Sequence, residues 1–256
     1  MNLKVAVVQF DIAWEDTSEN ISYLDKLLES IETDTDVVIL PEMFHCGFSM
    51  SPKKNAQQEG GAVLEWMKSL SIKKEVVVVG SVIVESKNEH YNRLYVVDDN
   101  NIEWYNKRHL FSMGSEHLHY KEGDQRLIVN VRGWNICPMI CYDLRFPVWS
   151  RNTNGDYDVL VYVANWPASR SSVWNTLLMA RAIENQSYVV GVNRVGEDAQ
   201  CEYLGESQVI NARGEKELYM SNESAVMYAV LDKNKLISFR NTFPVLNDAD
   251  DFSLKI

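Results

Sequence analysis

Long, nearly uninterrupted runs of Val and Ile most constrain what this chain can fold into. They include DVVILPE at 36–42, EVVVVGSVIVE at 75–85 and DVLVYVAN at 158–165. Because polar residues do not alternate regularly within these runs, both faces of each strand must be buried, which is typical of a sheet covered by helices. The runs therefore predict an α/β fold.

Segments with helical spacing alternate with these strands. Residues 18–31 place their apolar side chains on one stripe, with Ser18 as the expected N-cap, and helices are also expected at 62–74 and 172–186. The remaining expected strands are 4–10, 91–99 with 101–109 as a hairpin, 127–141 with a turn near Gly133, 188–196, 205–215 with a turn at 212–214, and 225–232. The hairpins suggest more than one sheet, and because no linker divides the chain, we expect a single domain over 1–256.

Composition excludes several classes of partner. The chain has 36 acidic against 25 basic residues and a net charge of -11, which argues against nucleic acid or an anionic membrane as the main partner. Neither a membrane-spanning stretch nor a signal peptide is expected. The four cysteines form no CxxC pair and have no zinc-finger spacing, which favours free thiols in a cytoplasmic protein without a metal.

Three expected strands end abruptly in a functional side chain. Glu42 ends VVILPE, Lys107 ends IEWYNK and Cys141 ends ICPMIC. Ligands bind where the strands of helix-covered sheets end, so these positions are candidates for one shared site. Taken singly, a solvated Glu, a surface Lys and a packing Cys are the commoner interpretations. Together the three form a working set for acyl transfer.

The chemistry needs all three residue types. Cys141 attacks well only as a thiolate, so Glu42 would take its proton and later return it to a leaving amine. Lys107 and the backbone N–H of Tyr142 would stabilise the oxyanion of the tetrahedral intermediate. The sequence contains no GxSxG motif, so a serine triad is not supported. Papain-like chemistry, in which His109 or His117 activates the thiol, stays open.

The segments VVILPEMF, WYNKRHLF and MICYDLRFP, in this order, resemble the nitrilase (carbon–nitrogen hydrolase) superfamily. The resemblance implies a catalytic triad of Glu42, Lys107 and Cys141. It also implies a second active-site glutamate, best assigned to Glu116 in GSEHLHYKEGD, with Glu122 as the rival. The implied fold is a four-layer αββα sandwich, usually paired into homodimers, with no metal or organic cofactor.

Further segments, including PEMFHCGFSM, VANWPASR and YLGESQVI, resemble the bacterial omega-amidases. This likeness implies hydrolysis of the terminal amide of 2-oxoglutaramate or 2-oxosuccinamate, through a cysteine thioester, to the 2-oxo acid and ammonia. A nitrilase or an N-carbamoyl amide hydrolase using the same triad is the alternative enzyme. A catalytically idle, thiol-bearing binding module is the alternative from another class.

A small amide that carries a carboxylate needs an anchor for that group. Arg145 and Arg170 are the candidates, because a guanidinium can clamp a carboxylate with two contacts. An ion pair with Asp143 is the alternative interpretation of Arg145. Phe44 and Trp166 are expected to wall a small pocket, together with Phe48, although aromatic side chains are more often plain core.

Overall fold

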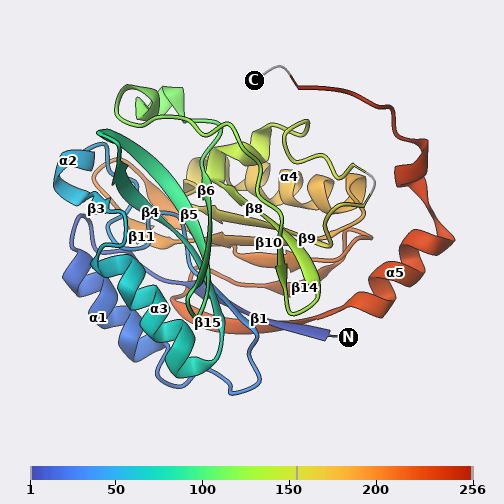
Figure 1. The fold of residues 1–256 in the computed structure, drawn as a ribbon, viewed down its shortest axis with the longest axis horizontal. Helices are drawn as coiled ribbons and strands as arrows, with labels where there is room; N and C mark the ends of the chain where they lie inside the picture. Colours follow the sequence, from blue (N-terminus) through green and yellow to red (C-terminus); the bar gives the residue numbers. More distant parts are fainter. Residues whose placement is uncertain (1, 154, 255–256) are drawn as a thin grey trace.

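The protein, described by a computed structural model over residues 2–153 and 155–254, contains two large mixed β-sheets (Figure 1). The first has seven strands, with the order β15-β1-β2-β4-β5-β6 and β3 beside β4. Its strands are β1 (Asn2–Gln9), β2 (Val37–Ile39), β3 (Gln57–Gln58), β4 (Val77–Ser86), β5 (Glu89–Asp98), β6 (Asn101–Asn106) and β15 (Ala225–Asp232).

The second sheet has six strands, with the order β14-β13-β10-β9-β8-β7. Its strands are β7 (Val129–Val131), β8 (Trp134–Ile140), β9 (Val159–Ala164), β10 (Tyr188–Asn193), β13 (Gln208–Ile210) and β14 (Lys216–Tyr219). A separate hairpin consists of β11 (Val195–Glu197) and β12 (Glu202–Leu204).

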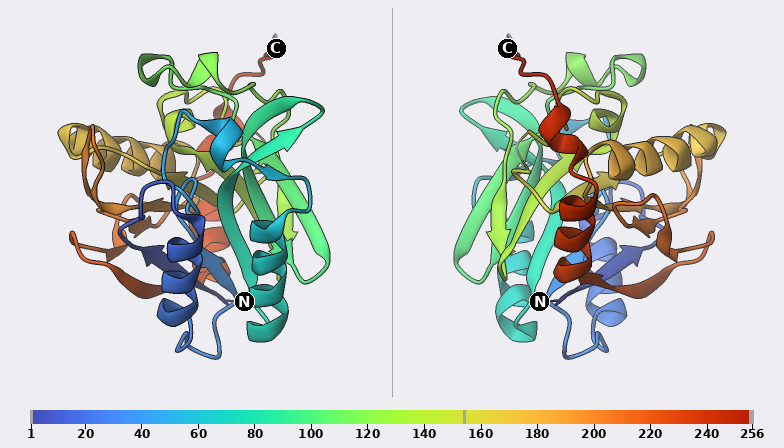
Figure 2. Two further views of the ribbon diagram at one scale, coloured as in Figure 1. Left: turned by 90° about the vertical axis from the view of Figure 1, so that its left-hand side faces the viewer. Right: turned by 90° about the vertical axis from the view of Figure 1, so that its right-hand side faces the viewer.

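Helices cover the outer faces of both sheets. Figure 2 shows α1 (Thr17–Leu27) and α3 (Ala62–Lys74) side by side on the first sheet, with α4 (Ser171–Glu184) on the far side of the molecule against the second sheet. The short α2 (Pro52–Asn55) lies near β3, and α5 (Lys233–Thr242) follows β15. Within the described residues, no helix is long and apolar enough to cross a membrane. The architecture is the expected four-layer αββα sandwich.

The uninterrupted apolar runs are explained by burial on both faces of each strand. In β2, Val37 and Ile39 belong to the core between the two sheets, whereas Val38 belongs to the core beneath α1 and α3. In the same way, Val77 of β4 points inward and Val78 points toward the helices. Neither face of these strands meets water, so selection for alternating polar residues is absent.

Several local expectations need correction. The first helix begins at Thr17, because the carboxylate of Asp16 accepts the Glu19 N–H at 2.9 Å and caps it in place of Ser18. This helix ends at Leu27 instead of continuing to residue 31. Helix α5 was not expected at all, because Leu236 is its only buried residue and no apolar stripe marks it. The β11–β12 hairpin was likewise not expected.

Candidate active site

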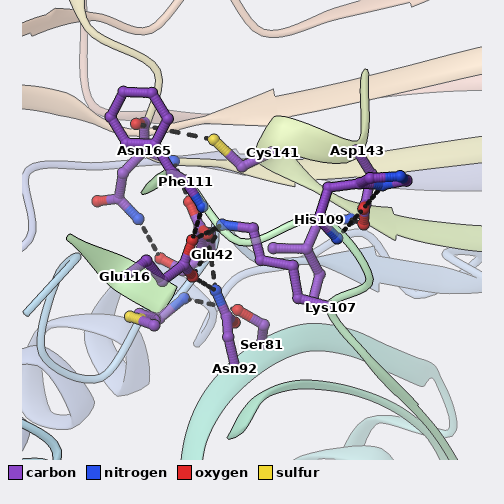
Figure 3. A network of polar contacts seen from close by, with 12 residues as sticks. Glu42, Ser81, Asn92, Lys107, His109, Phe111, Glu116, Cys141, Asp143 and Asn165 are labelled. Carbon is purple, nitrogen blue, oxygen red and sulfur yellow. Dashed lines mark hydrogen bonds and ion pairs between the residues drawn. The ribbon is translucent and has the colours of Figure 1, made fainter. Parts of the chain in front are cut away.

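The three strand-ending residues lie together between the two sheets (Figure 3). Glu42 and Lys107 come from the ends of β2 and β6 in the first sheet, and both are fully buried. Cys141 directly follows β8 in the second sheet, and Asn165 directly follows the neighbouring parallel strand β9. The site therefore needs both sheets, each of which delivers part of it.

The Glu42 carboxylate is held by three hydrogen bonds. Its Oε1 accepts from Lys107 Nζ at 2.9 Å and from Asn92 Nδ2 at 2.8 Å. Its Oε2 accepts from the backbone N–H of Asn165 at 2.9 Å. Because a carboxylate oxygen has two lone pairs, Oε2 keeps one lone pair without a protein donor in the described structure. The Glu42 carboxylate can therefore accept a proton at Oε2.

Glu116 is the second carboxylate of the site, and its oxygens are more fully occupied. Oε1 accepts from Lys107 at 3.0 Å and from Asn92 at 3.3 Å. Oε2 accepts from Lys107 at 2.9 Å and from the Phe111 N–H at 2.6 Å. The rival Glu122 is exposed at the surface. Lys107 thus forms ion pairs with two buried carboxylates, those of Glu42 and Glu116.

Opposing influences act on the two proton-bearing groups of the site. Burial disfavours the Lys107 charge, but Glu116 and Glu42 outweigh it, and the pKa of Lys107 is raised. Burial and the Glu42 carboxylate raise the pKa of Cys141 well above its usual value, although Lys107 opposes them. The lysine is therefore an ammonium and the resting sulfur a neutral thiol at neutral pH, so attack needs a base.

Cys141 sits on a strained turn that presents its sulfur. Its φ of 43° lies in the left-handed region, which is costly for a residue with a Cβ. It begins a 3-10 segment, Cys141–Arg145, in which the Tyr142 N–H belongs to the first turn and has no intrahelical acceptor. The sulfur lies 3.9 Å from the carbonyl oxygen of Asn165. The backbone N–H of Tyr142, which has no hydrogen-bond acceptor among the described residues, therefore lies next to the nucleophile.

A cavity of about 470 Å³ opens onto these groups. Lys107, Cys141 and Asn165 line it, as do both candidate arginines. Its aromatic wall consists of Trp14, Phe48, Phe111, Tyr142, Trp166 and Tyr203. This volume suits a small molecule, and the mixture of aromatic walls with a few polar groups is typical of ligand sites.

The charged side chains of the cavity differ in how they are paired. Arg145 lies 5.2 Å from the Trp166 ring centre and Arg170 lies 5.2 Å from that of Phe111. Within the described residues, neither guanidinium has an acidic partner, and the Asp143 carboxylate contacts His109 instead of Arg145. Both guanidiniums are therefore available to pair with an anionic ligand.

The two carboxylates that line the same cavity already accept hydrogen bonds from the protein. Glu15 accepts from Ser49 Oγ at 2.5 Å and from Lys54 Nζ at 2.7 Å. Asp198 accepts the Tyr203 hydroxyl at 2.7 Å and also caps the turn of the β11–β12 hairpin. An anionic ligand therefore finds two guanidiniums without an acidic partner in the described chain, whereas the charge of Glu15 is already balanced by Lys54.

Phe44 does not line the cavity, which corrects the expected pocket. Its side chain is fully buried in the core beneath α3, with its ring centre 5.7 Å from that of Trp66. Met43, just before it, has a φ of 46°, so the chain turns sharply after Glu42 and directs Phe44 to the helix side. Phe48, farther along the same loop, lines the cavity instead.

Sequence reasoning missed residues that hold the site together. Asn92 reaches both carboxylates from β5, and Asn165 binds Glu42 through its backbone N–H and, at 2.6 Å, through Nδ2 to the Glu42 carbonyl. The weak signal for Asn92 was a polar residue inside an apolar strand. Cys201 lines the cavity from the β11–β12 hairpin, which was also not expected.

The papain-like alternative finds no support in the geometry. The ring Nδ1 of His109 lies 2.8 Å from Asp143, and His117 is exposed. Neither histidine is among the residues that line the cavity. Across residues 2–153 and 155–254, no group of three or more His, Cys, Asp or Glu side chains is arranged to hold a metal ion.

Comparison with known proteins matches residues 4–241 to the carbon-nitrogen hydrolase family. The chain is 46% identical to Omega-amidase YafV of Escherichia coli K12 over 98% of each chain, and 33% identical to 2-oxoglutaramate amidase of Bacillus subtilis over 97% of this chain and 98% of that protein. It also superposes on a CN-hydrolase superfamily protein from Xanthomonas campestris, solved with an arsenic adduct in its active site, with a TM-score of 0.97, 38% identity and 100% of both chains covered. The chain therefore belongs to the carbon-nitrogen hydrolase family.

Proposed function

We propose that this carbon–nitrogen hydrolase is an omega-amidase, which hydrolyses the terminal amide of 2-oxoglutaramate or 2-oxosuccinamate to the 2-oxo acid and ammonia. The observation that carries the proposal is the pair of guanidiniums, Arg145 and Arg170, that line the cavity containing Cys141 and have no acidic partner within the described residues. The likeness to an omega-amidase and to a 2-oxoglutaramate amidase points to the same substrates.

In the first half of the reaction, Glu42 takes the Cys141 proton at Oε2, the oxygen with a spare lone pair. The sulfur then attacks the amide carbon, and the carbonyl oxygen becomes an oxyanion. Lys107 Nζ and the Tyr142 N–H stabilise that charge, both already in place before the substrate binds. The proton passes from sulfur to the Glu42 carboxylate, so the negative charge moves from Glu42 to the oxyanion and the net charge of the site does not change.

In the second half, protonated Glu42 gives its proton to the departing ammonia, and an acyl thioester remains on Cys141. Glu42 then takes a proton from water, which attacks the thioester and releases the 2-oxo acid, while the sulfur regains its proton. Glu116 keeps Lys107 charged and oriented through its bonds at 2.9 and 3.0 Å. Orientation of the substrate amide by Glu116 has less support, because both of its oxygens already have two donors.

The cavity charges favour a particular kind of amide. The carboxylate of a 2-oxo acid amide would pair with Arg145 or Arg170, which have no acidic partner in the described chain, through charge-assisted hydrogen bonds. An amino acid such as glutamine carries an ammonium at the position of the oxo group. That ammonium would meet the two guanidiniums, whereas the charge of Glu15 is already balanced by Lys54 and Asp198 already accepts three hydrogen bonds.

The test is ammonia release by the purified protein from 2-oxoglutaramate, with Cys141→Ala as the control. An aliphatic nitrile and an N-carbamoyl amino acid are assayed alongside. Ammonia from the oxo-amide that disappears in the variant supports the proposal. Activity on the nitrile or carbamoyl compound alone would keep the Cys141 chemistry and reject the omega-amidase assignment. No turnover of any substrate, with unreactive Cys141, would revive the idle binding module.

We also propose that the protein forms a homodimer. Exposed apolar side chains on α4 and directly after α5 support an interface there, including Ile183 at 49% and Phe243 at 59% exposure. Light scattering on the purified protein measures the mass in solution. Twice the 29.4 kDa of one chain is expected, and the mass of one chain would contradict the proposal.

A further inference from the structure

The proposed reaction does not use one buried carboxylate next to the nucleophile, that of Asp143. Its side chain is fully buried and accepts four hydrogen bonds. Oδ1 accepts from the backbone N–H of His109 at 2.9 Å and from the ring Nδ1 of His109 at 2.8 Å. Oδ2 accepts from the Ile140 N–H at 3.0 Å and from the Tyr105 hydroxyl at 2.7 Å.

These donors come from the two segments that carry the reacting groups. Tyr105 and His109 flank Lys107 at the end of β6 in the first sheet. Ile140 is the last residue of β8 and directly precedes Cys141 in the second sheet. One carboxylate therefore joins the lysine segment to the cysteine segment, as Figure 3 shows for Asp143 and His109.

The partners of Asp143 are themselves fixed. The Tyr105 oxygen accepts from the Arg108 N–H and from the Trp149 ring nitrogen, both at 3.0 Å, so its own hydrogen is left for Asp143. The His109 ring is stacked on Phe146, with 3.8 Å between ring centres. Because its partners are themselves held by further contacts, the Asp143 carboxylate has a fixed position relative to both segments that it bonds.

The turn that Asp143 caps needs such support. Cys141 has a left-handed φ of 43°, and a strained backbone persists only where its surroundings over-determine it. The Asp143 bond to the Ile140 N–H fixes the residue just before this turn, and Asp143 itself lies in the 3-10 segment just after it. One side chain, that of Asp143, therefore restrains the backbone on both sides of the strained residue Cys141.

We propose that Asp143 is a positioning residue that clamps the Cys141 turn to the Lys107 segment and so sets the place of the sulfur relative to the lysine ammonium. It touches neither substrate nor sulfur in this role. The inference rests on the proposed function only for the choice of amide substrate. The reactivity of Cys141 toward an alkylating reagent reports on the clamp without any substrate.

The test variant is Asp143→Asn, because an amide presents one oxygen and one NH2 group, so that one of the two donor pairs faces another donor. Misplacement of reacting groups by about 1 Å can cost about 100-fold, so kcat for 2-oxoglutaramate should fall about 10- to 100-fold. KM should stay within about threefold, since the arginines are untouched. Alkylation of Cys141 by iodoacetamide, followed by peptide mass spectrometry, should slow by about fivefold or more.

Asp158→Asn is the matched control. Asp158 is a buried carboxylate that accepts the Asn135 N–H at 3.0 Å and Lys233 Nζ at 2.9 Å, but it lies at the opposite end of β9 from Asn165. This variant should lower the thermal midpoint and leave the Cys141 alkylation rate unchanged. Equal effects of both variants on alkylation and kcat would show a general structural role and overturn the proposal.

A milder variant keeps the proposal testable if Asp143→Asn does not fold. His109→Phe retains the stacking on Phe146 and the backbone bond, and removes only the ring donor to Asp143. Cys141 alkylation should slow by about two- to fivefold, a fraction of the full 100-fold misplacement effect, and an unchanged rate would overturn the clamp. Should the wild type release no ammonia from 2-oxoglutaramate, the proposed function fails, yet the alkylation comparison still decides this inference.

Discussion

Lys107 and Arg170 are cations of the same cavity with opposite surroundings. Lys107 is fully buried between Glu42 and Glu116, and its charge is balanced before any ligand arrives. Arg170 lies on the face of Phe111 and has no acidic partner within the described residues. The difference indicates that the reaction centre is preorganised by the protein, whereas the cavity wall is completed by the charge of the substrate.

This contrast separates the expected kinetic effects. Groups balanced within the protein act where charge develops during the reaction, so their loss should appear in kcat. Groups whose charge is paired only when the substrate binds contribute similar binding energy to the ground state and the transition state, so their loss should appear mainly in KM. Each prediction that follows tests one side of this division.

The largest effect is expected at Glu42. Glu42→Gln removes the proton acceptor but keeps the shape of the side chain, and general bases contribute up to about 10⁴-fold, so kcat should fall by about 10³- to 10⁴-fold. Single-turnover assays of ammonia release measure the loss. An equal loss in Glu15→Gln, a cavity carboxylate outside the reaction centre, would contradict the assignment of Glu42 as base.

Lys107→Met should reduce both activity and stability. Loss of one oxyanion donor costs about 10²- to 10³-fold in kcat. The variant also leaves two buried carboxylates without their cation, and breaking a buried pair in this way costs about 3–5 kcal/mol in the free energy of unfolding. Denaturant titration measures the second effect. Lys68→Met, which breaks an exposed pair with Glu65, should cost less than about 1 kcal/mol. Similar costs for the two variants would contradict the account.

Arg170→Gln and Arg145→Gln should act on binding. A hydrogen bond to a charged group contributes about 1.5–3 kcal/mol, so each variant that loses its carboxylate contact should raise KM for 2-oxoglutaramate by about 10- to 100-fold. The kcat value should change by less than about threefold. Steady-state kinetics separates the two constants. A fall in kcat at constant KM would place the arginine in the reaction centre and break the division.

The smallest effect concerns pH. The pKa of Cys141 is raised in the folded protein by burial and by Glu42, so above about pH 8.5 the unfolded chain loses a proton that the folded chain keeps. Stability therefore falls as pH rises, and this thiol should contribute up to about 2 kcal/mol of that loss at pH 10. Denaturant titrations of wild type and Cys141→Ala at pH 7 and pH 10 measure it. An equal pH-dependent loss in both proteins would contradict the raised pKa.

The sequence predicts the reaction centre better than the cavity. Glu42, Lys107 and Cys141 could be found because each ends an apolar strand, and strand ends of packed sheets meet at one edge. Asn92 could not, because a buried polar residue within a strand gives no sign of what it contacts. Asn165 acts largely through its backbone N–H, which no side-chain pattern encodes.

The wrong assignment of Phe44 has a similar cause. The alternation of faces in β2 cannot be extended beyond Glu42, because Met43 takes a left-handed φ of 46° and redirects the chain. Cys201 could not be placed from strand periodicity either, because it reaches the cavity on the unexpected β11–β12 hairpin. Strands can be read from periodicity, whereas the loops that line a cavity depend on long-range packing that the local sequence does not specify.

The most direct test compares kcat/KM for 2-oxoglutaramate and L-glutamine, in the wild type and in a protein with both Arg145→Gln and Arg170→Gln. The account predicts that the wild type favours the oxo-amide by about 100-fold or more. Both substrates carry the carboxylate, but glutamine also carries an ammonium that meets two guanidiniums, and like-charge juxtaposition costs several kcal/mol. The ratio should fall at least about tenfold in the double variant. A wild-type ratio near one, or a ratio that the double variant leaves unchanged, would contradict the claim that Arg145 and Arg170 select the substrate by its charge.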